Sequence, residues 1–165
     1  MAEKQVRAIP EGREGVMAHL VVDGCAEAIE FYKKAFGAEE LERSPAPDGK
    51  RLIHAEVRIG GTVVYLVDDF PEYAGGQSRH PKALGGSPVT LHRYVEDIDG
   101  SMERALEAGA TVKMPAMDMF WGDRYGIVTD PFGHDWSFAT HIADPTKEEM
   151  EAAAAAMFAG DCCHE

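Results

Sequence analysis

The 165-residue sequence has no long hydrophobic run and few cysteines. No stretch approaches the roughly 20 apolar residues that cross a bilayer. The opening segment MAEKQVRAIPEGREG lacks the apolar core of a signal peptide. The cysteines, a lone Cys25 and the adjacent Cys162 and Cys163, do not make a disulfide framework and suit a reducing compartment. We therefore expect a cytoplasmic protein without a membrane partner.

Basic residues are also scarce. Sixteen Lys and Arg stand against 29 Asp and Glu, which gives a formal net charge of -13 at pH 7. A surface of this sign repels a phosphate backbone, so we expect no nucleic-acid partner. The apolar content of 45% is ordinary for a globular protein, and the chain is long enough to bury a core.

The sequence contains an internal repeat. HLVVDGCAEAIEFYKKAFGA at residues 19–38 returns as HRYVEDIDGSMERALEAGA at residues 92–110. Each copy opens on a histidine within an alternating, β-branched run that predicts a strand, and each continues with apolar residues at helical spacing. Gly37 and Gly109 stand where left-handed residues end helices, and Asp97 is a suitable N-cap for the second helix.

Further strands are predicted after each helix. Gly60 and Gly61 indicate a two-residue hairpin turn that pairs Glu56 with Tyr65. DPFG at residues 130–133 indicates a second tight turn. Both halves therefore have the order βαβββ. The predicted strands are residues 16–22, 39–45, 51–59, 62–68, 89–95, 110–117, 124–130 and 135–142.

We expect one domain over residues 1–144, built of modules 16–70 and 88–143 that the connector 71–87 joins. Residues 145–165 form a C-terminal helix and tail, because Thr146 and Glu149 make a capping box before an alanine-rich run. The apolar stripe of this helix requires cover from the domain or from a second subunit. The final CCHE is more typical of a free terminus than of a metal site.

Several motifs in this order resemble the vicinal oxygen chelate superfamily, which holds glyoxalases, bleomycin-resistance proteins and dioxygenases, and within it the PhnB-like branch. The motifs are AEAIEFYKKAFGAEE, HAEVRIGG, SPVTLHRYVEDID, FWGDRYG and DPFGHDWSFATH, spread over residues 16–144. The resemblance implies an α/β (α+β) glyoxalase/bleomycin-resistance fold, in which two βαβββ modules form a cup-shaped, barrel-like mixed sheet. It also implies a small-molecule ligand, often held on a divalent metal such as Zn, Ni, Fe or Mn, and a homodimer.

The resemblance also places the superfamily's usual four metal ligands. They fall on Met17, Tyr65, Thr90 and Ser137, none of which is a good ligand. His19 and His92 lie two residues beyond the first and third of these positions. Because side chains alternate along a strand, both histidines face the cup if those positions do.

The candidate site follows from the same alternation. We interpret Glu56, His54 and Tyr65 as candidate catalytic residues. The candidate ligand-binding residues are His19, Thr90, His92, Trp121 and Ser137, and the candidate metal ligands are His19, His92 and Glu56.

Plainer interpretations stay open for each candidate. The histidines also suit hydrogen-bonded structural roles, and RLIHAEVR also suits an exposed edge strand. Trp121 is either an aromatic wall of the cup or a loop anchor. Arg79 and His80 belong either to a lid or to an ordinary surface loop.

Two functional classes therefore remain. The first is a protein that binds a small molecule in a cup lined by His and Glu, without turnover. The alternative is a divalent-metal-dependent lyase, isomerase or dioxygenase, in which shifted histidines hold the metal beside a vicinal-oxygen substrate and Glu56 moves a proton. The poor ligands at the usual positions favour the first class or an unfamiliar arrangement of metal ligands.

Overall fold

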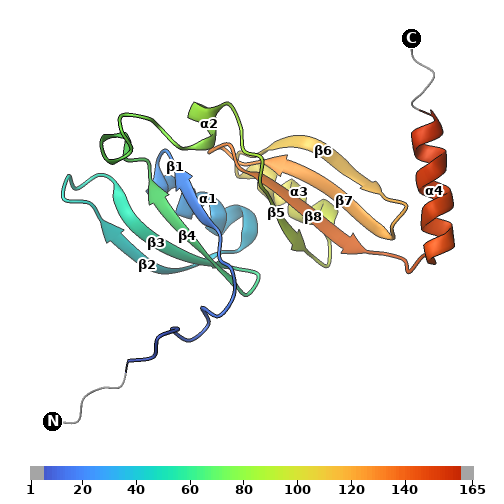
Figure 1. Cartoon of the computed structure of the whole chain (residues 1–165), viewed down its shortest axis with the longest axis horizontal. Helices are drawn as coiled ribbons and strands as arrows, with labels where there is room; N and C mark the ends of the chain where they lie inside the picture. The colour runs from blue at the N-terminus through green and yellow to red at the C-terminus, as the bar shows by residue number, and fades with distance from the viewer. Residues whose placement is uncertain (1–5, 161–165) are drawn as a thin grey trace. The chain divides into compact units, whose positions relative to one another are not determined.

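The structure is a computed structural model that describes residues 6–160. Its strands and helices follow the predicted order (Figure 1). The strands are β1 His19–Val22, β2 Glu39–Pro45, β3 Leu52–Ile59, β4 Thr62–Asp68, β5 Thr90–Tyr94, β6 Thr111–Asp118, β7 Asp123–Thr129 and β8 Asp135–His141. The helices are α1 Cys25–Phe36, the 3₁₀ helix η1 Pro71–Tyr73, α2 Pro81–Leu84, α3 Ile98–Glu107 and α4 Lys147–Gly160. Every strand ends within three residues of its predicted position.

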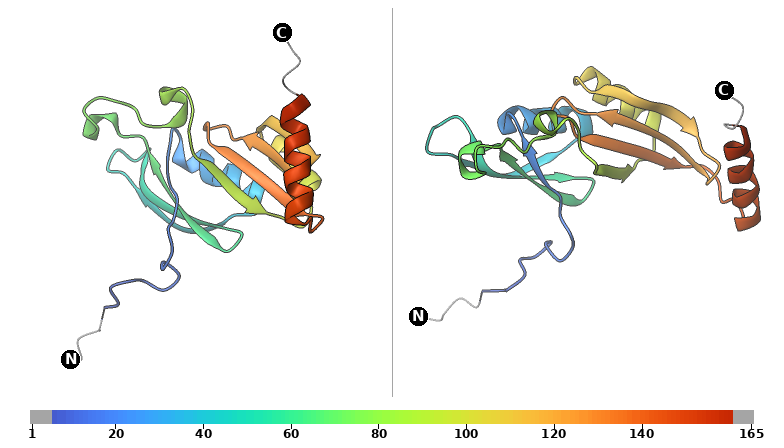
Figure 2. Two further views of the ribbon diagram at one scale, coloured as in Figure 1. Left: turned by 45° about the vertical axis from the view of Figure 1, so that its right-hand side comes forward. Right: turned by 45° about the horizontal axis from the view of Figure 1, so that its top comes forward.

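The chain divides between Gly86 and Ser87 into two compact units, each of which contains one βαβββ module. The first module has the sheet order β1-β4-β3-β2, and the second has the matching order β5-β8-β7-β6. In each sheet the first strand pairs parallel to the last, and the other pairs are antiparallel. Helix α1 covers one face of the first sheet, and α3 covers one face of the second (Figures 1 and 2). The predicted fold class is confirmed.

Local sequence signals set the helix ends. Gly37 adopts a left-handed φ of 64° and ends α1, while its N–H donates to the Tyr32 carbonyl. Asp97 caps α3, because its side chain accepts a hydrogen bond of 3.0 Å from the Gly100 N–H. Both predictions are confirmed.

A side chain from the fourth strand caps α1. The residue before this helix, Gly24, offers no side chain, and Asp68 at the end of β4 takes its place. One Asp68 oxygen accepts from the N–H groups of Gly24 and Cys25, at 3.0 and 2.8 Å. Its other oxygen accepts from the Leu52 N–H at 2.7 Å. Asp68 therefore ties the start of α1 to β3 and β4.

The second module repeats this arrangement with a hydroxyl. Thr140 lies three residues after Ser137 on β8, as Asp68 lies three residues after Tyr65 on β4. Its Oγ1 accepts from the Ile98 N–H at 3.0 Å, at the start of α3. The two modules therefore share, besides the strand order, a contact from the fourth strand to the start of the helix.

Each core lies between a sheet and its helix. The largest fully buried side chains are Tyr32, Ile29, Leu66, Val22 and Val57 in the first module and Phe138, Ile98 and Val128 in the second. Cys25 belongs to the first core, and burial followed by the charge of Asp68 raises the pKa of its thiol to about 12. A protonated, buried thiol of this kind is chemically inert.

The connector contains two short helices that the sequence analysis did not predict. Pro71 and Pro81 open η1 and α2, where a residue without an N–H is tolerated. The predicted capping box before α4 is confirmed, because the Thr146 N–H donates to Glu149 at 2.7 Å and the Glu149 N–H donates back to the Thr146 hydroxyl at 3.2 Å.

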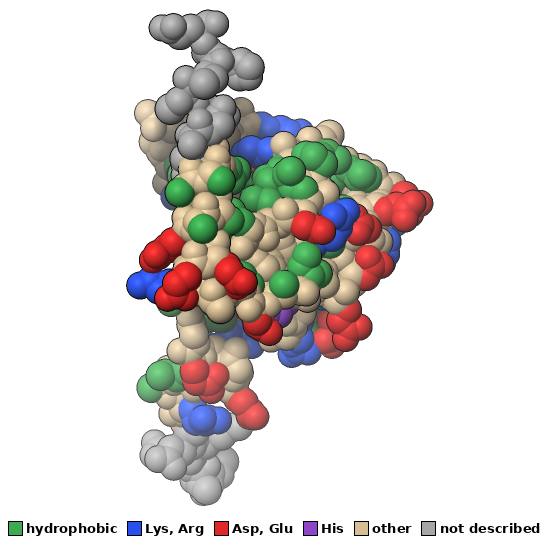
Figure 3. Space-filling model, turned by 90° about the vertical axis from the view of Figure 1, so that its right-hand side faces the viewer, with side chains coloured by type: hydrophobic (Ala, Val, Ile, Leu, Met, Phe, Trp, Pro, Cys, Tyr) green, Lys and Arg blue, Asp and Glu red, His purple; other side chains and the backbone are tan. Residues whose placement is uncertain are grey.

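Helix α4 carries acidic residues in its first turn and an alanine-rich segment after it (Figure 3). Met157 on this helix is 54% exposed. None of the helices within residues 6–160 is long and apolar enough to cross a membrane. Cys162, Cys163 and the rest of the CCHE segment lie outside the described residues.

Candidate functional site

A row of polar side chains crosses the first sheet. His19 on β1 pairs with Tyr65 on β4, Tyr65 pairs with Glu56 on β3, and Glu56 pairs with Glu42 on β2. The neighbouring residues of these strands, such as Leu20 and Leu66, are buried on the α1 side. Since successive side chains point to opposite faces, the row lies on the face away from α1. The predicted pairing of Glu56 with Tyr65 is confirmed.

His54 joins the row from β3. It lies two residues before Glu56, and its Nε2 is 3.3 Å from Glu56 Oε1. The Tyr65 ring lies edge-on to two imidazoles, with ring centroids 5.1 Å from His54 and 6.0 Å from His19. Strand β3 lies between β4 and β2, so the alternative of an exposed edge strand is wrong.

Arg13, which precedes β1, adds a positive charge to this row of side chains. Its guanidinium forms an ion pair with Glu56 Oε2, and the two side chains are 19% and 13% exposed. Arg13 was not predictable as a site residue, because it lies outside the repeat and no local pattern marks it.

Glu42 is a second residue that the sequence analysis missed. The pairing of β2 with β3 shifts between Glu40 and Glu42, where Leu41 forms a β-bulge. Together with His54 and Glu56, Glu42 forms a group whose potential ligand atoms all lie within 4.8 Å of one another. The predicted ligands His19 and His92 are not part of this group.

The surroundings of His19 change the pKa of its imidazole. Desolvation by its surroundings, and then the charges of His54 and Arg79, lower the pKa of the imidazole from its ordinary value. His19 is therefore neutral at pH 7 and can accept a hydrogen bond or bind a metal.

A pocket of about 250 Å³ opens in the first unit. Its lining residues are Ile53, Val67, Phe70, Tyr73 and Arg79. Val67 lies two residues after Tyr65 on β4, so the pocket lies on the sheet face that carries the polar row. Arg51 packs over Phe70, with its guanidinium carbon 4.2 Å from the ring centroid.

Two buried polar atoms belong to residues that are close in sequence to residues of this pocket, one just after β4 and one in the connector. Within residues 6–160, Asp69 Oδ1 and His80 Nδ1 have no hydrogen-bond partner. The other Asp69 oxygen accepts from the backbone N–H of Arg79 at 3.0 Å. Their side chains are only 7% and 15% exposed, and His80 Nε2 lies 4.0 Å from the other Asp69 oxygen. A lid and an ordinary surface loop both stay predictions for Arg79 and His80.

In the second module, aromatic rings surround His92 at the position where carboxylates lie near His19 in the first. His92 Nδ1 is 2.8 Å from the Ser137 hydroxyl, which lies opposite it on β8. The His92 ring packs edge-on against Tyr94, at 5.0 Å, and stacks on Tyr125, at 6.0 Å. The Trp121 ring centroid lies 5.9 Å from that of Tyr125. We call the rings of His92, Tyr94, Tyr125 and Trp121 the Trp121 wall.

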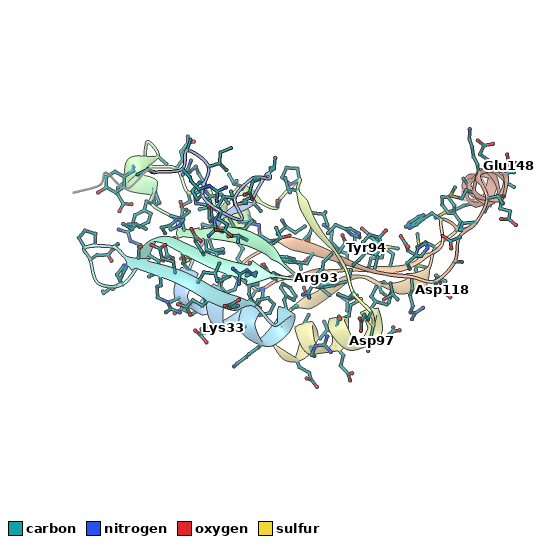
Figure 4. The ribbon with its side chains drawn as sticks, turned by 90° about the horizontal axis from the view of Figure 1, so that it is seen from below. Lys33, Arg93, Tyr94, Asp97, Asp118 and Glu148 are labelled. Atoms are coloured by element: carbon teal, nitrogen blue, oxygen red, sulfur yellow. The ribbon has the colours of Figure 1, made fainter. Side chains whose placement is uncertain are left out.

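Asp123 connects several of these side chains by hydrogen bonds. This buried carboxylate accepts hydrogen bonds from Tyr94 at 2.9 Å and from the Trp121 indole at 3.1 Å, and its Oδ1 lies 2.9 Å from His141. The indole hydrogen bond thus anchors the loop that carries Trp121, as one of the two interpretations expects, and a role in the wall of a cup stays a prediction. Tyr94 is labelled on β5 in Figure 4. Trp121 was a predicted site residue, whereas Asp123 was not.

The carboxylate and the imidazole of this network shift each other's pKa. Burial opposes ionisation of Asp123, yet hydrogen bonds from His141 and Tyr94 outweigh burial and lower its pKa. Hydrogen bonds to Asp123 and Asp144 raise the pKa of His141.

The four positions usual for metal in the resemblance do not fit a metal. Met17 precedes β1, Thr90 opens β5 as an exposed residue, and Ser137 is 1% exposed and bonded to His92. Tyr65 offers a phenol between two imidazoles. The structure brings Tyr65, His54 and Glu56 together, and it brings His92, Ser137 and the Trp121 wall together. A shared role for His19 and His92 stays a prediction.

Comparisons with known proteins agree with this fold. The family model of the Glyoxalase/Bleomycin resistance protein/Dioxygenase superfamily matches residues 16–138. The uncharacterized protein Rv0887c of Mycobacterium tuberculosis (strain ATCC 25618 / H37Rv) is 55% identical over 135 residues, which cover 82% of this chain and 79% of that protein. The uncharacterized protein At5g48480 of Arabidopsis thaliana is 31% identical over 172 residues, covering 90% of this chain and 99% of that protein.

Solved structures show the same likeness. The X-ray structure of the Arabidopsis thaliana At5g48480 gene product has a TM-score of 0.61 and 29% identity, over 76% of this chain and 97% of that chain. TioX from Micromonospora sp. ML1 has a TM-score of 0.56 and 25% identity, over 78% of this chain and 100% of that chain.

Proposed function

The chain belongs to the Glyoxalase/Bleomycin resistance protein/Dioxygenase superfamily, and from this membership we propose that it is a small-molecule-binding protein of the PhnB-like branch. The ligand contacts the polar face of the first sheet. The observation that carries the proposal is the pocket of about 250 Å³ beside the row of His19, Tyr65 and Glu56. This volume is close to the lower end of the range for small-molecule sites, about 300–1,000 Å³.

The lining of the pocket indicates the kind of ligand. Ile53, Val67 and Phe70 supply apolar walls, and Arg79 supplies a positive charge. Among the described residues, no carboxylate pairs with the Arg79 guanidinium; only its backbone is bonded, to Asp69. An unpaired arginine in an apolar pocket suits an anionic ligand with an aromatic or aliphatic body.

The buried polar atoms support the same proposal. An unsatisfied buried donor or acceptor costs about 1–3 kcal/mol. Asp69 Oδ1 and His80 Nδ1 therefore favour hydrogen bonds with polar groups of a ligand or with ordered water.

A fluorescent aromatic sulfonate, 1-anilinonaphthalene-8-sulfonate, tests the proposal. We expect saturable binding that weakens at least about tenfold in Arg79→Gln, because one charge-assisted hydrogen bond contributes about 1.5–3 kcal/mol. Arg58→Gln is the matched control, since Arg58 is an exposed β3 residue that pairs with Glu39 away from the pocket. Equal binding by all three proteins contradicts the proposal.

A second candidate is a divalent-metal-dependent lyase, isomerase or dioxygenase. The grouping of Glu42, His54 and Glu56 favours it, because imidazole and carboxylate ligands together suit the metals that such enzymes use. That Glu56 moves a proton in such an enzyme stays a prediction, which a carboxylate beside an imidazole suits.

A further inference from the structure

We propose that Glu42, His54 and Glu56 bind a divalent transition-metal ion on the face of the first sheet that lies away from α1. The three side chains come from the neighbouring strands β2 and β3, and each offers one ligand atom within 4.8 Å of the others. The site differs from the four usual positions, which lie before β1 and on β4, β5 and β8. It also does not depend on whether the Arg79 pocket binds an anion.

The strand register brings two like charges together. Glu42 and Glu56 are directly opposite in the antiparallel pair of β2 and β3. Like charges in this position destabilise a sheet unless a cation compensates them. The bulge at Leu41 produces the pairing, because an unshifted β2 would set Leu41 opposite Glu56. The local backbone thus replaces an apolar neighbour of Glu56 with a second carboxylate.

One positive charge stands against the two negative charges of Glu42 and Glu56. Arg13 neutralises Glu56, whereas Glu42 accepts only a hydrogen bond of 3.1 Å from the Ser44 hydroxyl and forms no ion pair within residues 6–160. Glu40 on the same strand, in contrast, pairs with both Lys33 and Arg43 on the α1 side. Lys33 is labelled on α1 in Figure 4.

The hydrogen bonds leave suitable ligand atoms accessible. Arg13 holds Oε2 of Glu56, so Oε1 remains directed at His54 Nε2, 3.3 Å away. A metal ion bound about 2.0–2.2 Å from each atom replaces this contact and requires only a small rotation of the side chains. Glu42 is exposed and can turn toward the ion.

The ligand set indicates the class of ion. Two carboxylate oxygens and one imidazole nitrogen suit Mn²⁺, Fe²⁺ and Zn²⁺ better than the soft ions that prefer thiolates. Three protein ligands leave further positions for water or for oxygen atoms of a small molecule. Arg13 acts as a positioning residue in this site, because it fixes Glu56 without contacting the ion.

Mn²⁺ binding to the untagged protein tests the proposal. The protein is first stripped of metal with a chelator, which is then removed, and free Mn²⁺ is measured by its electron paramagnetic resonance signal during the titration. Mn²⁺ is chosen because the thiolates of Cys162 and Cys163 favour softer ions. We expect one equivalent to bind, and we expect the affinity to fall at least tenfold in Glu42→Gln and in His54→Gln. Glu40→Gln is the matched control and keeps the wild-type affinity.

Three results overturn the proposal. They are the absence of Mn²⁺ binding by the wild-type protein, unchanged binding in both Glu42→Gln and His54→Gln, and an equal loss in Glu40→Gln, which indicates general attraction to an acidic surface. Thermal unfolding of each variant shows that a loss of binding is not a loss of fold. The sulfonate titration of Arg79→Gln separates this inference from the proposed function, because it measures a different ligand and a different pocket.

Discussion

Two histidines of this protein respond to their surroundings in opposite directions. His19 has neighbours that disfavour its charged form, and its pKa is lowered. His141 lies between Asp123 and Asp144, whose carboxylates favour the charged form and raise its pKa. His19, as a neutral imidazole, can therefore bind a cation or accept a hydrogen bond, whereas His141 forms a charged network with its two carboxylates.

The two shifts predict opposite effects of pH on the free energy of unfolding. Between the raised pKa of His141 and its unfolded value near 6.5, the native state holds more protons, so this contribution is complete below about pH 6.5 and is lost as pH rises. Between the lowered pKa of His19 and about pH 6.5, the unfolded state holds more protons, so stability rises with pH.

Titration of the histidine ring signals by NMR checks this prediction. We expect the His141 midpoint above, and the His19 midpoint below, the ordinary value of 6.5. In Asp123→Asn the His141 midpoint falls toward that value, because one carboxylate is gone, while His19 in the other module is unaffected. A His141 midpoint that does not move in Asp123→Asn contradicts the hydrogen-bond network.

At the level of elements, the helix caps supplied from the fourth strands connect each helix to its sheet. Asp68 accepts three backbone hydrogen bonds, two at the start of α1 and one from β3. Its negative charge also lies at the positive end of the helix dipole. The capping of α1 therefore depends on a contact between residues more than forty positions apart.

Removal of this cap has a predictable cost. We expect Asp68→Ala to lower the free energy of unfolding by about 2–4 kcal/mol, because it removes a cap and leaves buried N–H groups without acceptors. Asp23→Ala is the control, since Asp23 is exposed and also lies beside the start of α1. Urea unfolding measures both, and equal effects of the two substitutions contradict a specific capping role for Asp68.

The elements also show what the sequence can predict. The Gly60-Gly61 turn fixes the register of β3 and β4, because a two-residue hairpin leaves one pairing, and so Glu56 opposite Tyr65 was predictable. The bulge at Leu41 was not, since nothing in EELERSP marks an extra residue. Glu42 therefore escaped prediction, although it belongs to the same row.

Contacts between residues far apart in the sequence were unpredictable for a related reason. Arg13 meets Glu56 across 43 positions of the chain, and Asp68 meets the start of α1 across 43 and 44 positions. Contacts of this kind depend on the packed fold, whereas strands, turns and local caps depend on neighbours in the sequence. The Asp97 cap and the Thr146 capping box were predictable on that ground.

On the scale of the whole molecule, the repeat gives two equivalent modules with different surfaces. His19 and His92 occupy matching places, each opposite the fourth strand of its own sheet. Around His19 lie carboxylates and a phenol, and around His92 lie a hydroxyl and aromatic rings. A homodimer stays a prediction, as does a single site that uses both histidines.

A double-mutant cycle on the two histidines tests whether the modules share one site. The probe is again 1-anilinonaphthalene-8-sulfonate, whose expected position beside Arg79 belongs to the first module. If one surface binds the probe, His19→Ala and His92→Ala each weaken binding about fivefold, because each removes a hydrogen bond of about 1 kcal/mol. The double variant then departs from additivity by at least about 0.5 kcal/mol, as residues that share a partner do. Both residues are exposed, so the melting temperature changes little in any of the variants. Wild-type affinity in His92→Ala would mean that the first module binds the probe alone, and the matching histidines would then reflect only the repeat.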